Sequence, residues 1–316
     1  MSESEVIKLA QIPRSEIKEQ LTVEYYFDFR GHPFRHQDLL LDPEVNSVIA
    51  VLERIHSYAN TWLERSISDR WTDNHLTKIT ADTYQGNSKG YFKILVEDEA
   101  VFDPGYVVGV AREGDGNTLY AERGASVIGA NIFLDSGDIF IGEGTLVEPG
   151  SGIKGPTIIG KHNEIRGGAY FRGNVITGDQ GTFRGEIKNA VMMDGANFPH
   201  PSYVGDSICG YKTHFGNQAT TANLGIYAGV FGKQNILVRL NGKVYDTGRP
   251  KIGIILGDYS QVGCNSVSDP GVFLAPNTIV YQLCRINKGF YGPQEVIKYK
   301  PLENKVIERD TLRRLN

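Results

Sequence analysis

A repeat of six residues runs through residues 141–176 and constrains the fold more than any other feature of the chain. Its large apolar residues are Ile141, Val147, Ile153, Ile159, Ile165 and Phe171. The short residues that follow each of them four positions later are Thr145, Ser151, Thr157, Asn163, Ala169 and Val175. A period of six fits neither a 3.6-residue helix nor a two-residue strand alternation. We therefore predict a hexapeptide solenoid, in which each hexad forms one short strand and a corner around the large residues.

Glycine has a definite place in this repeat. Gly142 and Gly160 follow two of the large residues, and the chain contains 37 glycines in all. We expect glycine and asparagine to supply backbone angles at the corners that other residues resist. Large residues six positions apart are expected to begin the repeat near Ile128, followed by Leu134 and Phe140, and the phase then slips by one position to that of Ile141.

The repeat extends over about half of the chain. It becomes irregular after Phe171, returns in residues 203–221 and resumes in residues 256–280. The predicted fold class is mainly β: a parallel β-helix of hexapeptide repeats with a small N-terminal α/β region. The predicted parts are an N-terminal region (1–126), the β-helix (127–284) with an inserted loop at about 224–250, and a C-terminal tail (285–316).

Composition narrows the class of protein. The 316 residues are 40% apolar and 22% charged, with a net charge of −4, which argues against a nucleic-acid binder. The chain contains no run of about 18 apolar residues, so no membrane span is predicted. Residues 1–20 lack the apolar core of a signal peptide. Cys209 and Cys284 fall in the phase of the repeat and are expected to be buried thiols. Together these features predict a cytoplasmic protein.

The first third of the chain has mixed character. Apolar residues at helical spacing predict a helix from about residue 43 to 67, and residues 91–110 predict two strands around a turn at 103–105. We find no catalytic constellation in this region. The spacing of its histidines does not indicate a metal site; they are His32, His36, His56 and His75.

Several segments carry a family resemblance. They are VEPGSGIKGPTIIG, IRGGAYFRGNVI, GEIKNAVMMDGANFPHPSYVGDSICG and the later TANL. Over roughly residues 127–283 the chain resembles the C-terminal acetyltransferase domain of bifunctional glucosamine-1-phosphate acetyltransferase/N-acetylglucosamine-1-phosphate uridylyltransferase, and its archaeal sugar-1-phosphate relatives. Solenoids of this kind are usually left-handed. The first third does not resemble the nucleotidyltransferase half of that family, so uridylyl transfer is not expected.

The resemblance implies an activity. It is CoA-dependent N-acetyl transfer to an amino-sugar 1-phosphate such as glucosamine 1-phosphate, in the synthesis of nucleotide-sugar and cell-envelope precursors. Acetyl-CoA would be the co-substrate, and no metal would be required. The resemblance also implies a homotrimer with active sites in the grooves between subunits.

The resemblance further assigns roles to individual residues. His200 matches the catalytic histidine, and a base that titrates near neutrality suits deprotonation of an amine. Arg172 and Lys188 match the phosphate-binding cations. Tyr203 and Asn223 match residues that hold the sugar. Other interpretations remain open: His200 as a surface-loop histidine, Arg172 and Lys188 as solvated corner residues, and Tyr203 as part of the core.

The expected CoA site lies at Gly216, Asn217 and Cys264. Here the chain departs from the family, because His214 replaces an active-site asparagine, and Asn217 and Gln218 are larger than the family's residues. Small residues at such positions let a pantetheine arm approach the backbone. The alternative function is therefore a non-catalytic binding or scaffold protein that recognises a sugar phosphate or nucleotide sugar.

Two further classes of enzyme are also built on such a solenoid. Some left-handed β-helices are zinc carbonic anhydrases with three histidines from neighbouring subunits, which here would be His162, His200 and His214. The chain contains no close pair of histidines in support of that reading. Lipid A N-acyltransferases also carry a domain before the prism, but the PHPSYVGDS segment argues against this class.

Overall fold

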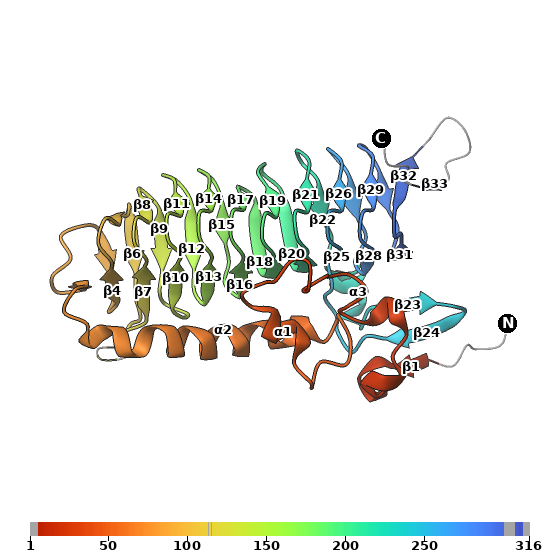
Figure 1. The fold of residues 1–316 in the computed structure, drawn as a ribbon, viewed down its shortest axis with the longest axis horizontal. Coiled ribbons are helices and arrows are strands. Elements are labelled where there is room, and N and C mark those ends of the chain that lie inside the picture. Colours follow the sequence, from red (N-terminus) through yellow and green to blue (C-terminus); the bar gives the residue numbers. More distant parts are fainter. Residues whose placement is uncertain (1–5, 113, 115, 300–306, 312–316) are drawn as a thin grey trace. The chain divides into compact units, whose positions relative to one another are not determined.

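A computed structural model describes residues 6–112, 114, 116–299 and 307–311. Part of the expected C-terminal tail, residues 300–306 and 312–316, lies outside these ranges. The chain divides into two compact units, one of residues 55–201 and one of residues 1–54 with 202–316. Each unit contains successive coils of parallel strands (Figure 1).

The unit of residues 55–201 is a three-sided parallel solenoid. Ile141 pairs with Ile159, and Val147 pairs with Ile165, so regular coils contain 18 residues, or three hexads. The first face contains β4 Lys93–Val96, β7 Thr118–Ala121, β10 Ile139–Ile141, β13 Thr157–Ile159 and β16 Val175–Thr177. The second contains β5 Val101–Asp103, β8 Ser126–Ile128, β11 Leu146–Val147, β14 Glu164–Ile165, β17 Thr182–Phe183 and β19 Asn197–Phe198. The third contains β3 Ser88–Lys89, β6 Tyr106–Val108, β9 Asn131–Phe133, β12 Gly152–Lys154 and β15 Tyr170–Phe171.

This arrangement is the left-handed parallel β-helix that the hexads predict. Strand β18 (Glu186–Met192) continues the third face and then the first, and β2 (Thr77–Thr80) adds an antiparallel strand to β4. Phe171 pairs with Ile187, only 16 positions on, which explains why the sequence register becomes irregular there. The two strands expected in residues 91–110 are instead three, β4, β5 and β6, on three different faces.

The hexad phase correctly predicts the core. The large residues Ile141, Val147, Ile153, Ile159, Ile165 and Phe171 are all fully buried. The short residues of the repeat do more than fill space, because several bind corner carbonyls. Thr145 Oγ1 donates to the Gly160 carbonyl at 2.7 Å, and Asn163 Nδ2 donates to the Gly178 carbonyl at 2.9 Å. These side chains satisfy backbone acceptors that would otherwise be buried without a partner.

The structure places the start of the repeat one residue before the predicted Ile128. Ile128 is 40% exposed, whereas Val127 is fully buried and pairs with Val147. Val127 and Val147 are 20 positions apart, so this coil is longer than the regular ones and the six-residue phase cannot be extrapolated through it.

Gly142 and Gly160 are required for a different reason from the corner backbone angles that the sequence predicts. A Cβ on Gly142 would lie 2.5 Å from the Gly160 carbonyl, so close stacking of coils, not a positive φ, requires glycine.

Helix α2 (Val51–Ile67) lies alongside the coils of this unit through its residues 55–67 (Figure 1). Its buried stripe is Ile55, Ala59, Leu63 and Ile67, at helical spacing. The rings of Trp62 and Phe140 pack edge to face, with their centroids 4.9 Å apart. His56 Nδ1 forms a hydrogen bond with Asn174 Oδ1 at 2.8 Å. The helix explains why the outward residues of the first face, Tyr120, Phe140, Ile158, Ile176 and Val191, are buried too.

The helix begins later than its apolar spacing predicts. Residues 43–50 form turns and not helix, and a shorter helix, α1 (Gln37–Leu41), precedes them. Asp42 Oδ1 accepts the Glu44 N–H at 2.8 Å, and the Val48 N–H donates to the Leu21 carbonyl at 2.8 Å. This tertiary hydrogen bond takes a donor that a helix would need.

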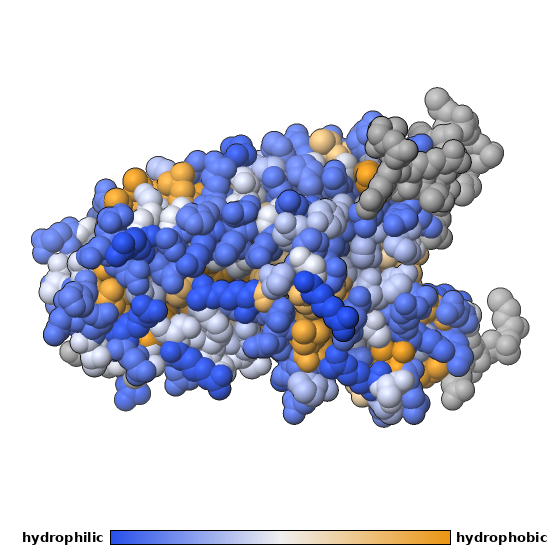
Figure 2. Space-filling view, in the orientation of Figure 1, coloured by the Kyte–Doolittle hydropathy of each residue, from blue (hydrophilic) through white to orange (hydrophobic). Residues whose placement is uncertain are grey.

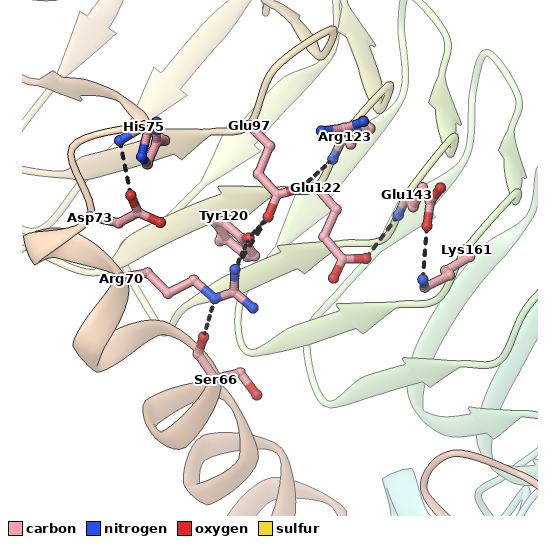
Figure 3. A network of polar contacts seen from close by, with 10 residues as sticks. All are labelled: Ser66, Arg70, Asp73, His75, Glu97, Tyr120, Glu122, Arg123, Glu143 and Lys161. Atoms are coloured by element: carbon pink, nitrogen blue, oxygen red, sulfur yellow. Dashed lines mark hydrogen bonds and ion pairs between the residues drawn. The ribbon is translucent and has the colours of Figure 1, made fainter.

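Acidic side chains connect successive corners of the unit of residues 55–201. Glu97 accepts the backbone N–H of Arg123, and Glu122 accepts that of Glu143 (Figure 3). Glu97 also binds Tyr120 and Arg70, and Arg70 follows α2 in the 3-10 helix Ser68–Thr72. The network therefore fastens the C-terminal end of the helix to the coils.

The second unit repeats the three-sided plan. Its first face contains β20 Tyr203–Cys209, β25 Ile254–Leu256, β28 Val272–Leu274 and β31 Gly289–Tyr291. The second face contains β21 His214–Phe215, β26 Gln261–Val262, β29 Ile279–Val280, β32 Glu295–Tyr299 and the antiparallel β33 Ile307–Thr311. The third face contains β22 Thr220–Thr221, β27 Val267–Ser268 and β30 Arg285–Ile286. Residues 285–299 thus continue the coil. Cys209 and Cys284 are buried, as predicted, whereas Cys264 is exposed.

One coil of this unit carries a long insertion. Ile208 pairs with Ile255, although regular partners such as Ile255 and Phe273 are 18 positions apart. The insertion contains the short helix α3 (Ala228–Phe231) and the hairpin of β23 (Leu237–Leu240) and β24 (Lys243–Asp246). The N-terminal strand β1 (Val6–Lys8) pairs with β24, and 3-10 turns follow it at Leu9–Gln11, Arg14–Glu16 and Glu19–Leu21.

Buried His36 makes stability depend on pH. Burial, and secondarily the charge of Arg35, lowers the pKa of His36 from 6.5 to about 3. The unfolded chain takes up a proton near pH 6.5, but the folded chain does not. The stability that neutral His36 contributes to the folded state is therefore fully present above pH 6.5. It is lost as the pH falls from 6.5 toward 3, at up to about 1.4 kcal/mol per pH unit. We expect chemical denaturation to show this loss between pH 7 and 5.

The His36→Gln variant removes the titrating group and should flatten that dependence. The exposed His75 provides a matched control, because His75→Gln should retain the wild-type slope. Equal slopes for wild type and His36→Gln would contradict the assignment.

In the view of Figure 2 the surface is mostly hydrophilic, with smaller apolar patches. Within the described ranges, no helix is both long and apolar enough to cross a membrane.

Candidate functional site

The predicted site residues fall into two sets, one on each compact unit. Arg172, Lys188 and His200 belong to residues 55–201. The other predicted residues belong to the second unit: Tyr203, Gly216, Asn217, Asn223 and Cys264. The PHPSYVGDS motif contains the junction between the units, at Pro201 and Ser202.

Arg172 and Lys188 occupy equivalent positions on neighbouring coils. Phe171 pairs with Ile187, and the Arg172 N–H donates to the Ile187 carbonyl at 2.9 Å. Because Phe171 and Ile187 are buried, strand alternation directs the next residue of each strand outward. Adjacent strands lie about 4.8 Å apart, a distance that one phosphate group can bridge. The sequence-based assignment therefore selects two cations that the fold brings together.

Glu186 completes this cationic pair. Its carboxylate accepts a hydrogen bond from Arg172 Nη1 at 2.6 Å, and both side chains are partly exposed. Such an exposed ion pair contributes little to stability, so a phosphate could displace the carboxylate at small cost. His200 lies half-buried in a bend after β19. Asn197 and Phe198 of that strand pair with Thr182 and Phe183 of β17, which fixes the start of the bend.

Tyr203 and Asn223 belong to one hydrogen-bonded cluster on the second unit. Asn223 Nδ2 donates to Tyr203 Oη at 2.9 Å and to Asp206 Oδ2 at 2.6 Å. The Asn223 carbonyl accepts the Ile252 N–H, which ties the residue to the coil beyond the insertion. The structure therefore brings together two residues that are 20 positions apart in the sequence.

Sequence reasoning missed two members of this cluster. Asp206 is buried and has a positive φ of 49°, and Arg249 Nη2 lies 3.7 Å from its Oδ1. A buried carboxylate needs a charged or hydrogen-bonding partner, and Arg249 with Asn223 provides both. Arg249 also forms an ion pair with Glu53 at 3.3 Å. Asp206 lies inside the PHPSYVGDS motif and could have been named from it, whereas no sequence signal connects Arg249 to Asp206.

The residues expected at the CoA site form a stacked corner. The Gly216 N–H donates to the Val262 carbonyl at 2.8 Å, and the Asn265 N–H donates to the Asn217 carbonyl at 2.8 Å. A Cβ on Gly216 would lie 2.6 Å from the Cys264 nitrogen. Coil stacking alone therefore explains this glycine. Asn217 and Gln218 are exposed at the same corner, and Gln218 has a positive φ of 59°.

Metal binding has no geometric support in the part of the chain that the structure describes. There, no three His, Cys, Asp or Glu side chains lie close enough together to hold a metal ion. His162 and His200 belong to one unit and His214 to the other.

No known protein-family profile matches the chain. It is 34% identical over 168 residues to the "Bifunctional protein GlmU" of Methanococcus maripaludis. This aligned region covers 52% of this chain and 39% of that protein. It is 33% identical over 103 residues to a "Bifunctional sugar-1-phosphate nucleotidylyltransferase/acetyltransferase" of Sulfurisphaera tokodaii, covering 33% and 24%. It is also 31% identical over 145 residues to the "Putative uncharacterized acetyltransferase YaiX" of Escherichia coli, covering 45% and 61%.

These matches confirm the resemblance to acetyltransferases of the sugar-1-phosphate group, and they fall on the C-terminal half of the bifunctional proteins. The chain spans less than half of the length of the first two relatives.

Proposed function

We propose that this chain is a CoA-dependent acetyltransferase that acts on the amino group of an amino-sugar 1-phosphate, such as glucosamine 1-phosphate. The observation that carries the proposal is the placement of Arg172 and Lys188 on adjacent coils, next to one partly exposed carboxylate. Two outward cations at strand spacing suit the oxygens of a phosphate. The named relatives support the acetyl-transfer part of the proposal.

The proposed roles follow the resemblance residue by residue. His200 accepts a proton from the ammonium of the sugar, and the free amine attacks the thioester carbonyl of acetyl-CoA. The C–N bond forms, the C–S bond breaks, and the CoA sulfur leaves and takes up a proton. Arg172 and Lys188 hold the phosphate, and Tyr203 and Asn223 hold the sugar. The CoA would lie along the corner of Gly216, Asn217 and Cys264.

Asp206 has a supporting place in this proposal. The amide nitrogen of Asn223 is already shared between Tyr203 and Asp206. This arrangement leaves the Asn223 amide oxygen as the group that could accept a hydrogen bond from a sugar hydroxyl or amine. Asp206 and Arg249 are therefore proposed to orient Asn223 and not to contact the substrate.

Release of the free CoA thiol tests the function. With acetyl-CoA present, we expect release with glucosamine 1-phosphate and none with glucose 1-phosphate, because the reaction needs an amine. We also propose a homotrimer, so light scattering on the same preparation should report about three times the chain mass of 35.0 kDa.

A binding protein on the same fold is the second candidate. The exposed Asn217 and Gln218 favour it, since they place larger side chains at the corner proposed for CoA. Thermal stabilisation by amino-sugar phosphates without any thiol release would support this candidate and contradict acetyl transfer.

A further inference from the structure

The insertion of the second unit forms the roof of a pocket that the proposed acetyl transfer does not use. The pocket has a volume of about 700 Å³, within the range of small-molecule sites. Its floor comes from three successive coils, because β22, β27 and β30 are neighbouring strands. The floor residues are Ala222, Asp269, Pro270, Arg285 and Lys288.

The roof is mainly apolar, with Gln234 and Asn235 as its polar side chains, and it is anchored at one side. Leu224, Ile226, Tyr227, Phe231 and Ile236 line it. Ile236 is buried, its N–H donates to the Arg249 carbonyl at 2.8 Å, and its Cγ2 packs over the floor at Gly271. The roof is therefore fixed to the coils on the side where the β23–β24 hairpin begins.

The other side of the roof exposes an unusual amount of apolar surface. Ile226, Tyr227, Val230 and Phe231 are 89, 69, 74 and 70% exposed. Four large apolar residues within six positions are more than the single exposed residues that folded proteins normally tolerate. The ring centroids of Tyr227 and Phe231 lie 6.0 Å apart, and both residues line the pocket. An apolar ligand in the pocket would cover these two rings.

The floor supplies positive charge. Arg285 Nη2 lies 3.3 Å from both carboxylate oxygens of Asp269, so Asp269 balances that charge. Lys288 is exposed, and among the ion pairs of the described residues none includes it. The stem of Lys288 lies over Gly271, since its Cγ and Cδ are 3.6 Å from where a Cβ would be. Two cations and one carboxylate leave one positive charge for a ligand.

We propose that this pocket binds a small amphipathic anion, whose apolar body lies against Tyr227 and Phe231 and whose anionic group lies at Lys288 and Arg285. A bare sugar phosphate fits poorly, because its hydroxyls would face apolar walls and lose hydrogen bonds to water. The shared chemistry of the ligand is an aliphatic or aromatic body with one anionic end, either a carboxylate or a phosphate monoester. None of the residues assigned to acetyl transfer lines this pocket, so the inference does not depend on that proposed function.

Calorimetric titration with decanoate, decyl phosphate and uncharged 1-decanol tests the proposal. We expect wild-type protein to bind at least one of the two anions more tightly than 1-decanol. A preference for decanoate assigns a carboxylate ligand, and a preference for decyl phosphate assigns a phosphate monoester. No binding of either anion at a Kd below about 1 mM would overturn the proposal.

Four variants, all at exposed positions, separate the pocket from the surrounding surface. Lys288→Gln and Phe231→Ser should each weaken anion binding about tenfold, through loss of a charged hydrogen bond and of apolar contact respectively. Val230→Ser and Lys233→Gln are the matched controls, because these residues are exposed on the same segment but do not line the pocket. Both controls should bind like wild type, and all four variants should keep the wild-type melting temperature.

Two results would contradict the proposal. Equal weakening by Val230→Ser and Phe231→Ser would mean that the whole apolar segment acts as a surface, as it would on a lipid bilayer. A lower mass in light scattering for both of these variants would mean that a second copy of the chain covers the segment.

Discussion

We expect the Ile159→Asp variant not to fold, because its carboxylate would lie in the apolar interior of the coil. Ile159 is fully buried in β13 and pairs with Ile141 of the preceding coil and, through its strand, with β16 of the next. A buried carboxylate without a partner costs several kcal/mol or more, comparable to the total stability of a domain. Each coil of a solenoid is buried only by its neighbours, so the loss would spread along the stack.

Two further variants make this result interpretable. Ile159→Ala should fold but lose about 2–5 kcal/mol of unfolding free energy, as other large-to-small core changes do. Ile128→Asp is the matched control, because Ile128 is 40% exposed in the same unit and its aspartate would reach water. Circular dichroism and chemical denaturation check all three variants. Wild-type melting of Ile159→Asp would show that the inward phase of the repeat is wrong.

The second large effect is expected at His200. If His200 removes the proton from the sugar amine, His200→Ala should lower kcat by about 10²–10⁴-fold with little change in KM for the sugar. Arg172→Ala should instead mainly raise KM, because phosphate binding is equally strong in the ground state and the transition state. The measurement is steady-state release of CoA thiol with glucosamine 1-phosphate as acceptor.

A control for His200 must remove an imidazole elsewhere without straining the chain. His162 is exposed on the same unit and has a φ of 53°, so His162→Asn keeps a residue that tolerates this conformation. His162→Asn should retain wild-type kcat. Activity that survives His200→Ala unchanged would remove His200 from the mechanism, even if the chain proves to be an acetyltransferase.

The periodicity of the sequence predicts the solenoid because its contacts are regular in the chain. Each hexad packs on the hexads 18 positions before and after it, so the residue that faces inward is repeated in the sequence itself. The same reasoning fails at Ile128, where a coil of different length shifts the phase. Family motifs, and not periodicity, identified Arg172 and Lys188, which are 16 positions apart and follow paired residues of neighbouring coils.

Sequence alone therefore determined the β-helix and its buried hexad residues, both of which depend on contacts between neighbouring coils. Only the tertiary structure decided that α2 covers the first face, because consecutive apolar residues such as Ile158 and Ile159 do not reveal what lies outside. Only the tertiary structure placed Arg249 against Asp206 and the insertion over the pocket floor. An insertion has no periodic partner, so its contacts depend on where its chain folds back and not on any spacing in the sequence.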